Sequence, residues 1–156
     1  MNTYLEPQPV YPDTIMVGES EVEAAPTTIK VLMVEPGKLA YEREIGTELK
    51  DLQAVVGGFI EPYYPFEEEV CIVCNDEGKF NGMFANRAIY DKEGTMIDII
   101  FGPFFICDCS SEEFKSLSEE QMNKYKEMYL QPEYFDKVEG KWVATKYTPA
   151  VDLGAR

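Results

Sequence analysis

Short apolar or alternating runs follow one another through the middle of the chain. The run 29–34 is apolar at nearly every position and stops at a Pro-Gly turn, which is typical of a buried strand. In the run 40–45, Tyr41, Arg43 and Ile45 share one side of an extended chain, which predicts a second strand. Further runs bounded by turn-forming residues predict strands at 59–64, 70–74, 88–90, 96–101 and 104–109. Proline inside 59–64 favours an edge strand or a bulge there.

Two segments have helical spacing instead. Thr47 precedes an apolar stripe that ends at Gly57-Gly58, so we predict a helix capped by Thr47; the stripe consists of Leu49, Leu52, Val55 and Val56. The segments 110–113 and 118–121 both fit the capping box, in which a Ser and a later Glu or Gln satisfy each other's backbone N–H groups. The second box opens a helix that ends at Pro132, with an apolar stripe of Met122, Tyr125, Met128 and Tyr129. A small hairpin is predicted at 138–143.

These elements predict one α+β domain. Because few strands are joined by helices, a doubly wound parallel sheet is disfavoured. We expect a mixed, mainly antiparallel sheet of short strands, with two or three helices packed on one face. Residues 1–28 hold five acidic and no basic residues and four of the ten prolines, which predicts an acidic arm that is disordered or loosely docked. The domain then covers 29–135, and 136–156 form a short C-terminal hairpin or tail.

The amino-acid composition excludes several classes of catalytic and metal-binding site. The 156 residues include no histidine, which excludes Ser-His-Asp and Cys-His catalytic units and every histidine metal ligand. No phosphate-binding glycine loop and no GxSxG motif is present. The net charge of −15 repels phosphate backbones and anionic lipids, so we expect no direct contact with nucleic acid or membranes. Without a secretory leader or an apolar span, the expected location is the cytoplasm of a bacterial host, where cysteines are reduced.

Several short motifs in order resemble a family. Over about residues 29–109 the chain is similar to the domain-of-unknown-function family DUF3846, through the runs Ile29-Lys30-Val31-Leu32, Val34-Glu35-Pro36-Gly37, Val56-Gly57-Gly58-Phe59-Ile60-Glu61, Asn75-Asp76-Glu77-Gly78-Lys79, Asn86-Arg87-Ala88 and Asp98-Ile99-Ile100-Phe101-Gly102-Pro103-Phe104-Phe105-Ile106. The resemblance implies an origin in phages, plasmids or conjugative elements. It implies no activity and no catalytic residues.

The four cysteines invite a zinc interpretation, since Cys71-x-x-Cys74 and Cys107-x-Cys109 supply four thiolates. Their spacing argues against it, because Cys71 and Cys74 point to opposite faces of a strand. Cys107 and Cys109 do share a face. We favour small buried hydrophobic side chains and expect neither a metal nor a cofactor.

The polar segment 75–87 is the candidate ligand site. Lys79 and Arg87 are suited to a phosphate, and Asn81 and Asn86 to a base or amide edge. Tyr90, with Tyr63 and Tyr64, is suited to stacking on a ring. The alternative is a hairpin turn at 75–78 and a loop whose Asn side chains satisfy their own backbone.

Acidic runs give the second candidate site, which consists of Glu67, Glu68, Glu69, Glu112 and Glu113. Such runs, including Glu119-Glu120, are commonly solvated faces or favourable charges at helix N-termini. They also suit docking onto the basic nucleic-acid channel of another protein, helped by electrostatic steering.

Two functions follow as hypotheses. The first is a non-enzymatic accessory protein of a phage or conjugative element, which binds a host protein through its acidic surface and inhibits a nucleic-acid-acting defence enzyme. The alternative is a protein that binds or sequesters a nucleotide-like small molecule. We expect no enzyme, because no nucleophile has an activating base nearby in the sequence.

Overall fold

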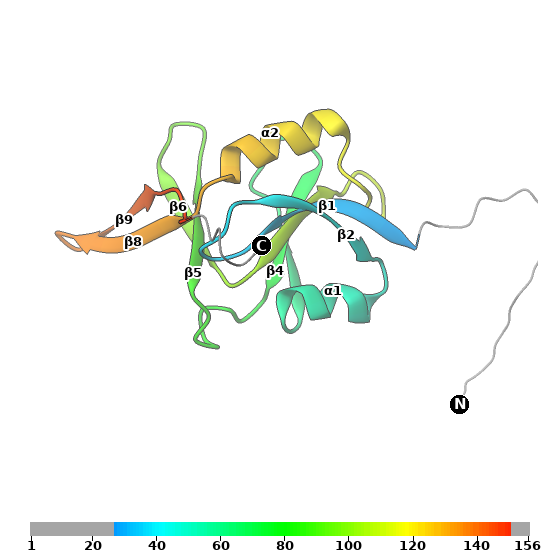
Figure 1. The fold of residues 1–156 in the computed structure, drawn as a ribbon, viewed down its shortest axis with the longest axis horizontal. Helices are drawn as coiled ribbons and strands as arrows, with labels where there is room; N and C mark the ends of the chain where they lie inside the picture. The colour runs from blue at the N-terminus through cyan, green and yellow to red at the C-terminus, as the bar shows by residue number, and fades with distance from the viewer. Residues whose placement is uncertain (1–26, 151–156) are drawn as a thin grey trace, which may run out of the picture.

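A five-stranded antiparallel sheet forms the centre of the computed structural model, which describes residues 27–150 (Figure 1). The strand order is β2-β1-β7-β4-β3. Every neighbouring pair is antiparallel. The strands are β1 (Thr28–Val34), β2 (Tyr41–Gly46), β3 (Ile60–Tyr63), β4 (Val70–Asn75) and β7 (Phe104–Asp108). The strand that contains Pro62, β3, lies at the edge, as its proline predicts.

Two further strand pairs flank this sheet. The first joins β5 (Ala85–Tyr90) to β6 (Met96–Phe101), and the second is a hairpin of β8 (Glu133–Val138) and β9 (Lys141–Lys146). The hairpin turn falls at Glu139-Gly140, inside the predicted range, but its strands are longer than expected. With helices α1 (Leu49–Val56) and α2 (Glu119–Tyr129), the described residues confirm the predicted α+β class with mainly antiparallel strands.

The two helices cover opposite faces of the central sheet, in place of the single face expected. Leu32 and Val34 of β1 pack in one cluster with Tyr125 of α2. The alternate residues Val31 and Met33 pack in the other cluster with helix α1. Strands β1, β4 and β7 are apolar at consecutive positions and bury both faces, so each face requires its own helix. Figure 1 shows α2 above and α1 below the sheet.

Local signals fix most helix ends. Ser118 caps α2 through the predicted box, accepting from the N–H of Gln121 at 3.1 Å while the Gln121 side chain accepts from the N–H of Ser118 at 2.8 Å. Helix α1 ends at Gly57 in the left-handed conformation, as predicted. Its N-cap is Glu48 rather than Thr47, because the Asp51 carboxylate accepts from the N–H of Glu48.

The first capping-box sequence, at 110–113, opens no helix. It lies in the loop between β7 and α2, where Lys115 and Asp108 exchange two backbone hydrogen bonds instead. Among residues 27–150 no helix is long and apolar enough to cross a membrane. Of the expected N-terminal arm, residues 1–26 lie outside the described residues, as do residues 151–156 of the tail.

Candidate functional site

Two residues of the predicted ligand site, Asn86 and Arg87, lie in the interior, with 1% and 0% of their surface exposed. Arg87 donates from Nε to the Tyr129 carbonyl at 3.1 Å and from Nη2 to the Lys38 carbonyl at 2.8 Å. Its Nη1 donates to Oδ1 of Asn86 at 2.9 Å. Asn86 in turn donates to the backbone carbonyls of β1 and of the β6–β7 turn. Both side chains are therefore occupied by the fold and are not accessible to a ligand.

The position of Arg87 has an electrostatic reason. Its guanidinium faces the last carbonyls of α2, where the helix macrodipole is negative. Burial lowers the pKa of Arg87 to about 10, against the opposing effect of nearby Glu133. The side chain is therefore a cation at neutral pH that joins α2 to the β1–β2 turn.

The other predicted ligand residues are separated. Lys79 and Asn81 are exposed in the segment between β4 and β5, and Lys79 pairs with Asp98 at 3.2 Å. Lys79 and Tyr63 border a hollow of about 290 Å³, which Tyr90 does not line. The alternative interpretation of this segment is correct for the turn, since Asn75 accepts from the N–H of Glu77, but not for a hairpin, because β4 and β5 on either side do not pair.

A larger cleft lies between α2 and β5, and we call it the α2–β5 cleft. Its volume is about 520 Å³. Residues from five parts of the chain line it. They are residues 65–68 before β4; Ala88 and Tyr90 of β5 with Asp91 and Lys92 of the turn that follows; Lys124, Tyr125, Met128 and Tyr129 of α2; Glu133 of β8; and Lys146 of β9. Sequence reasoning named Glu67, Glu68 and Tyr90 for two different sites, and the structure brings all three to this one.

Aromatic rings form part of the cleft wall. Phe66 packs against Tyr125 with ring centroids 4.7 Å apart and against Tyr129 at 6.4 Å. Tyr129 contacts Phe104 of the central sheet at 6.1 Å, edge to face. The helical spacing of Tyr125 and Tyr129 revealed an apolar stripe, but it carried no sign that part of this stripe borders a cleft.

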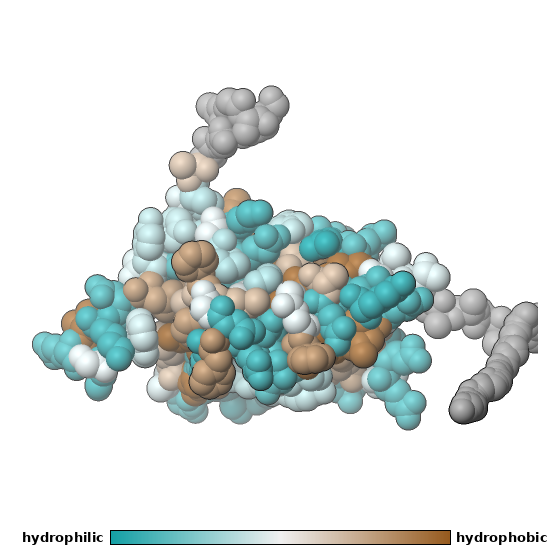
Figure 2. Space-filling view, turned by 90° about the horizontal axis from the view of Figure 1, so that it is seen from below, coloured by the Kyte–Doolittle hydropathy of each residue, from teal (hydrophilic) through white to brown (hydrophobic). Residues whose placement is uncertain are grey.

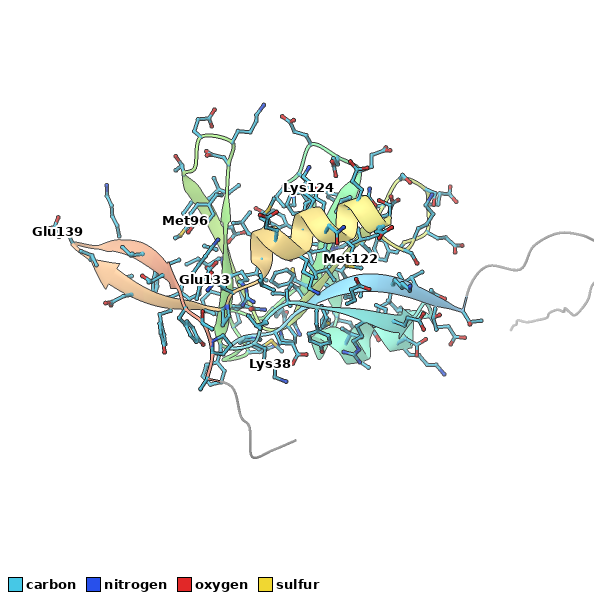
Figure 3. The ribbon with its side chains drawn as sticks, turned by 45° about the horizontal axis from the view of Figure 1, so that its top comes forward. Lys38, Met96, Met122, Lys124, Glu133 and Glu139 are labelled. Carbon is cyan, nitrogen blue, oxygen red and sulfur yellow. The ribbon has the colours of Figure 1, made fainter. Side chains whose placement is uncertain are left out.

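Ion pairs cross the rim of the cleft. Lys92 contacts Glu67 at 2.6 Å and joins the β5–β6 turn to the loop before β4. Glu68 accepts from Lys124 at 2.9 Å and from the Tyr125 hydroxyl at 2.9 Å, and these hydrogen bonds lower its pKa. Figure 3 shows Lys124 on α2 beside this loop. Two carboxylates predicted to bind a partner are thus engaged within the molecule.

Glu133 connects β8 to the outer edge of β5. Its Oε1 accepts from the backbone N–H of Ala88 at 2.9 Å. Burial raises the pKa of Glu133, while the Ala88 hydrogen bond and the charge of Arg87 act in the opposite direction. No motif pointed to this residue, because Ala88, which donates to it, lies 45 positions away.

The remaining predicted carboxylates lie at the end of the central sheet where β4 begins and β7 ends. Glu69 and Cys109 are joined there by a backbone hydrogen bond, and Gln121 of α2 donates to Asp108. The segment 108–120 carries five carboxylates and one lysine. We call this surface the acidic end; it comprises Glu69, Asp108, Glu112, Glu113, Glu119 and Glu120. Glu112 and Glu113 border a hollow of about 280 Å³.

Apolar side chains also reach the surface of the molecule. Figure 2 shows apolar residues among hydrophilic ones on the face seen from below, which is the side of α1. Phe59, which follows α1 after Gly57-Gly58, is 70% exposed, and Phe80 and Phe84 are 87% and 80% exposed. Exposed aromatic side chains therefore interrupt the hydrophilic surface.

The cysteines are divided as the strand pattern predicts. Cys71 and Cys107 lie opposite each other on β4 and β7 with their sulfur atoms 3.9 Å apart, whereas Cys74 packs on the other face. Burial raises the pKa of Cys74 to about 12. Within residues 27–150 no group of three or more Cys, Asp or Glu side chains is arranged to hold a metal ion.

Comparison with known proteins identifies one family. The family described as Domain of unknown function (DUF3846) matches residues 29–130, which extends the resemblance beyond β7 through α2. The comparisons with curated proteins and with solved structures gave no match.

Proposed function

This chain belongs to the DUF3846 family, and from that premise we propose that it is a non-enzymatic protein that binds a basic surface on a host protein. The observation that carries the proposal is the acidic end. Residues 108–120, which run from the end of β7 through the loop to the start of α2, hold five carboxylates and a single lysine, Lys115.

The acidic end is suited to docking because its predicted carboxylates project from exposed positions. Glu69, Glu112 and Glu113 are exposed, and no ion pair within 4 Å involves them in the part of the chain that the structure describes. An exposed field of one sign accelerates encounter with an oppositely charged surface and selects against like-charged ones. Glu67 and Glu68 contribute less, because lysines neutralise them.

We propose further that the protein is an accessory protein of a phage or conjugative element, and that its host partner acts on nucleic acid. A surface that binds phosphates must be basic, and the acidic end offers it carboxylates in their place. Blocking such a surface would inhibit a nuclease or another defence enzyme.

The test is a pull-down from a lysate of the bacterial host, with washes at low and high salt and identification by mass spectrometry. The variant is Glu112→Lys with Glu113→Lys, and the matched control is Asp136→Lys with Glu139→Lys on the β8–β9 hairpin. Figures 1 and 3 show the hairpin at the opposite end of the molecule from the β7–α2 loop.

The proposal expects a nucleic-acid-acting protein that is bound at low salt, released at high salt, retained by the hairpin variant and lost by the acidic-end variant. Equal retention of that protein by both variants at low salt would refute the role of the acidic end.

A further inference from the structure

The α2–β5 cleft combines aromatic rings with carboxylates. Tyr90, Tyr125 and Tyr129 line it together with Phe66. The faces of such rings carry partial negative charge and attract cations, most strongly where water is excluded. Its volume of about 520 Å³ lies within the range of roughly 300–1,000 Å³ that is usual for small-molecule sites.

Several charged side chains of the cleft already interact within the molecule and are not available to a ligand. Four carboxylates and three lysines line it. Glu67 and Glu68 pair with Lys92 and Lys124. Asp91 accepts at Oδ1 from the backbone N–H groups of two residues in its own turn. The two charged side chains of the cleft that none of these contacts involves are Glu133 and Lys146, which lie opposite each other in the β8–β9 register.

Glu133 has acceptor capacity beyond its bond to Ala88. A carboxylate offers about four lone-pair sites, and the Ala88 N–H occupies one of them at Oε1. No ion pair within 4 Å involves Glu133 in the described part of the chain. Glu133 lines the cleft together with Tyr90 and Tyr129. Burial raises the pKa of both phenols, and the charge of Glu133 acts in the same direction, at Tyr129 after the effect of Tyr125.

We propose that the α2–β5 cleft binds a free organic cation, an ammonium or guanidinium group on an apolar or aromatic body, with Glu133 accepting from the cation and the tyrosine rings surrounding it. An anion is disfavoured, because two of the three lysines of the cleft are already paired, the third, Lys146, lies opposite the Glu133 carboxylate, and the chain carries a net charge of −15. The cleft and the acidic end share none of their defining residues, so this proposal stands or falls separately from the proposed function.

The test is a calorimetric or NMR titration of the full chain with benzylamine, which is charged at neutral pH, and with benzyl alcohol, its uncharged counterpart. Benzylamine is expected to bind saturably and at least about tenfold more tightly than the alcohol, since a charged hydrogen bond contributes about 1.5–3 kcal/mol. Benzylguanidine tests the guanidinium on the same aromatic body, and adenosine monophosphate tests an anion. Equal affinity for amine and alcohol, or tighter binding of the nucleotide, would overturn the proposal.

A variant locates the site. Glu133→Gln keeps an oxygen for the Ala88 N–H and removes the charge, so benzylamine should bind about tenfold more weakly. Glu139→Gln is the matched control; it removes the same charge at the hairpin turn, where Figure 3 shows Glu139 far from Glu133. An equal loss in both variants would mean non-specific attraction to an acidic protein and would contradict the proposal.

A second variant covers the case in which Glu133→Gln does not fold. Tyr90 is 43% exposed at the cleft, so Tyr90→Leu removes a ring with little effect on the core. It should weaken benzylamine binding about fivefold, because a cation–π contact contributes roughly 1 kcal/mol. Unchanged affinity in Tyr90→Leu would count against the aromatic part of the site.

Discussion

At the scale of single residues, Arg87 joins three segments that are distant in sequence. Its guanidinium reaches carbonyls at the end of α2 and in the β1–β2 turn, and it also contacts the Asn86 side chain on its own strand. A planar group with five N–H donors suits this arrangement better than an ammonium group. From the sequence, Asn86 and Arg87 were predicted to bind a ligand, because polar residues between strands are typical of binding loops.

We predict that Arg87→Met destabilises the fold by about 3 kcal/mol, because several buried carbonyls then lose their donors. Urea unfolding followed by far-UV circular dichroism measures the change. Arg43→Met on exposed β2 is the control and should change stability by less than about 0.5 kcal/mol. Equal effects of the two substitutions would show that the buried hydrogen bonds of Arg87 contribute little.

Tyr41 and Glu35 give a pH-dependent prediction. The Tyr41 hydroxyl donates to the Glu35 carboxylate, and this hydrogen bond lowers the pKa of Glu35. A lowered carboxyl pKa contributes stability above the unfolded pKa, about 4.3, and this contribution is lost as the pH falls through the folded value.

Tyr41→Phe should therefore cost about 1 kcal/mol at neutral pH and progressively less below about pH 4. Unfolding curves of both proteins across that range check the prediction. A difference that stays constant down to low pH would mean that the hydrogen bond does not depend on the ionised carboxylate.

At the scale of elements, α2 is held by side chains at both ends. Ser118 and Gln121 satisfy N–H groups at its start, and Arg87 satisfies carbonyls at its end. The start was predictable because a capping box is contained in four consecutive residues. The end contact was not, since it comes from a strand 42 positions earlier.

We predict that Ser118→Ala costs about 1 kcal/mol of stability, the usual loss for an N-cap. Ser111→Ala is the control, because Ser111 belongs to a similar sequence that opens no helix and its hydroxyl donates to a carbonyl two residues away. Its effect in thermal unfolding should stay within about 0.5 kcal/mol. A larger loss for Ser111→Ala would indicate that the loop, rather than the cap, holds α2.

The strands show what local patterns determine. The sequence located every strand of the central sheet to within a few residues, because apolar runs and turn residues are local. It did not predict the order of the strands or the second helix-covered face, since these depend on which runs pair. The cleft was predictable only in fragments: Tyr90, Glu67 and Glu68 were named, but Tyr125, Tyr129 and Glu133 join them only in space.

At the scale of the whole molecule, charge is unevenly distributed. The acidic end lies at one end of the central sheet. The β8–β9 hairpin, residues 133–146, carries three lysines and three acidic residues and is therefore neutral overall. A net charge of −15 implies self-repulsion in the folded state.

We predict that salt stabilises the protein. Raising sodium chloride from about 0.02 M to about 0.5 M shortens the screening length severalfold and weakens this repulsion, so the melting temperature should rise. Potassium chloride at the same concentrations is the control for a specific ion effect and should act equally. A falling melting temperature would show that ion pairs such as Lys92–Glu67 outweigh the repulsion.

The hairpin also determines what optical measurements report. Trp142 is the only tryptophan of the chain, and it lies on β9, 47% exposed, with the Lys137 ammonium 5.1 Å from its ring centre. Strand β9 pairs with β8 rather than with the central sheet. Tryptophan fluorescence therefore follows the local environment of the hairpin, and its emission can change while the central sheet is intact. A fluorescence transition that precedes the circular dichroism transition would be the signature of a hairpin that detaches first.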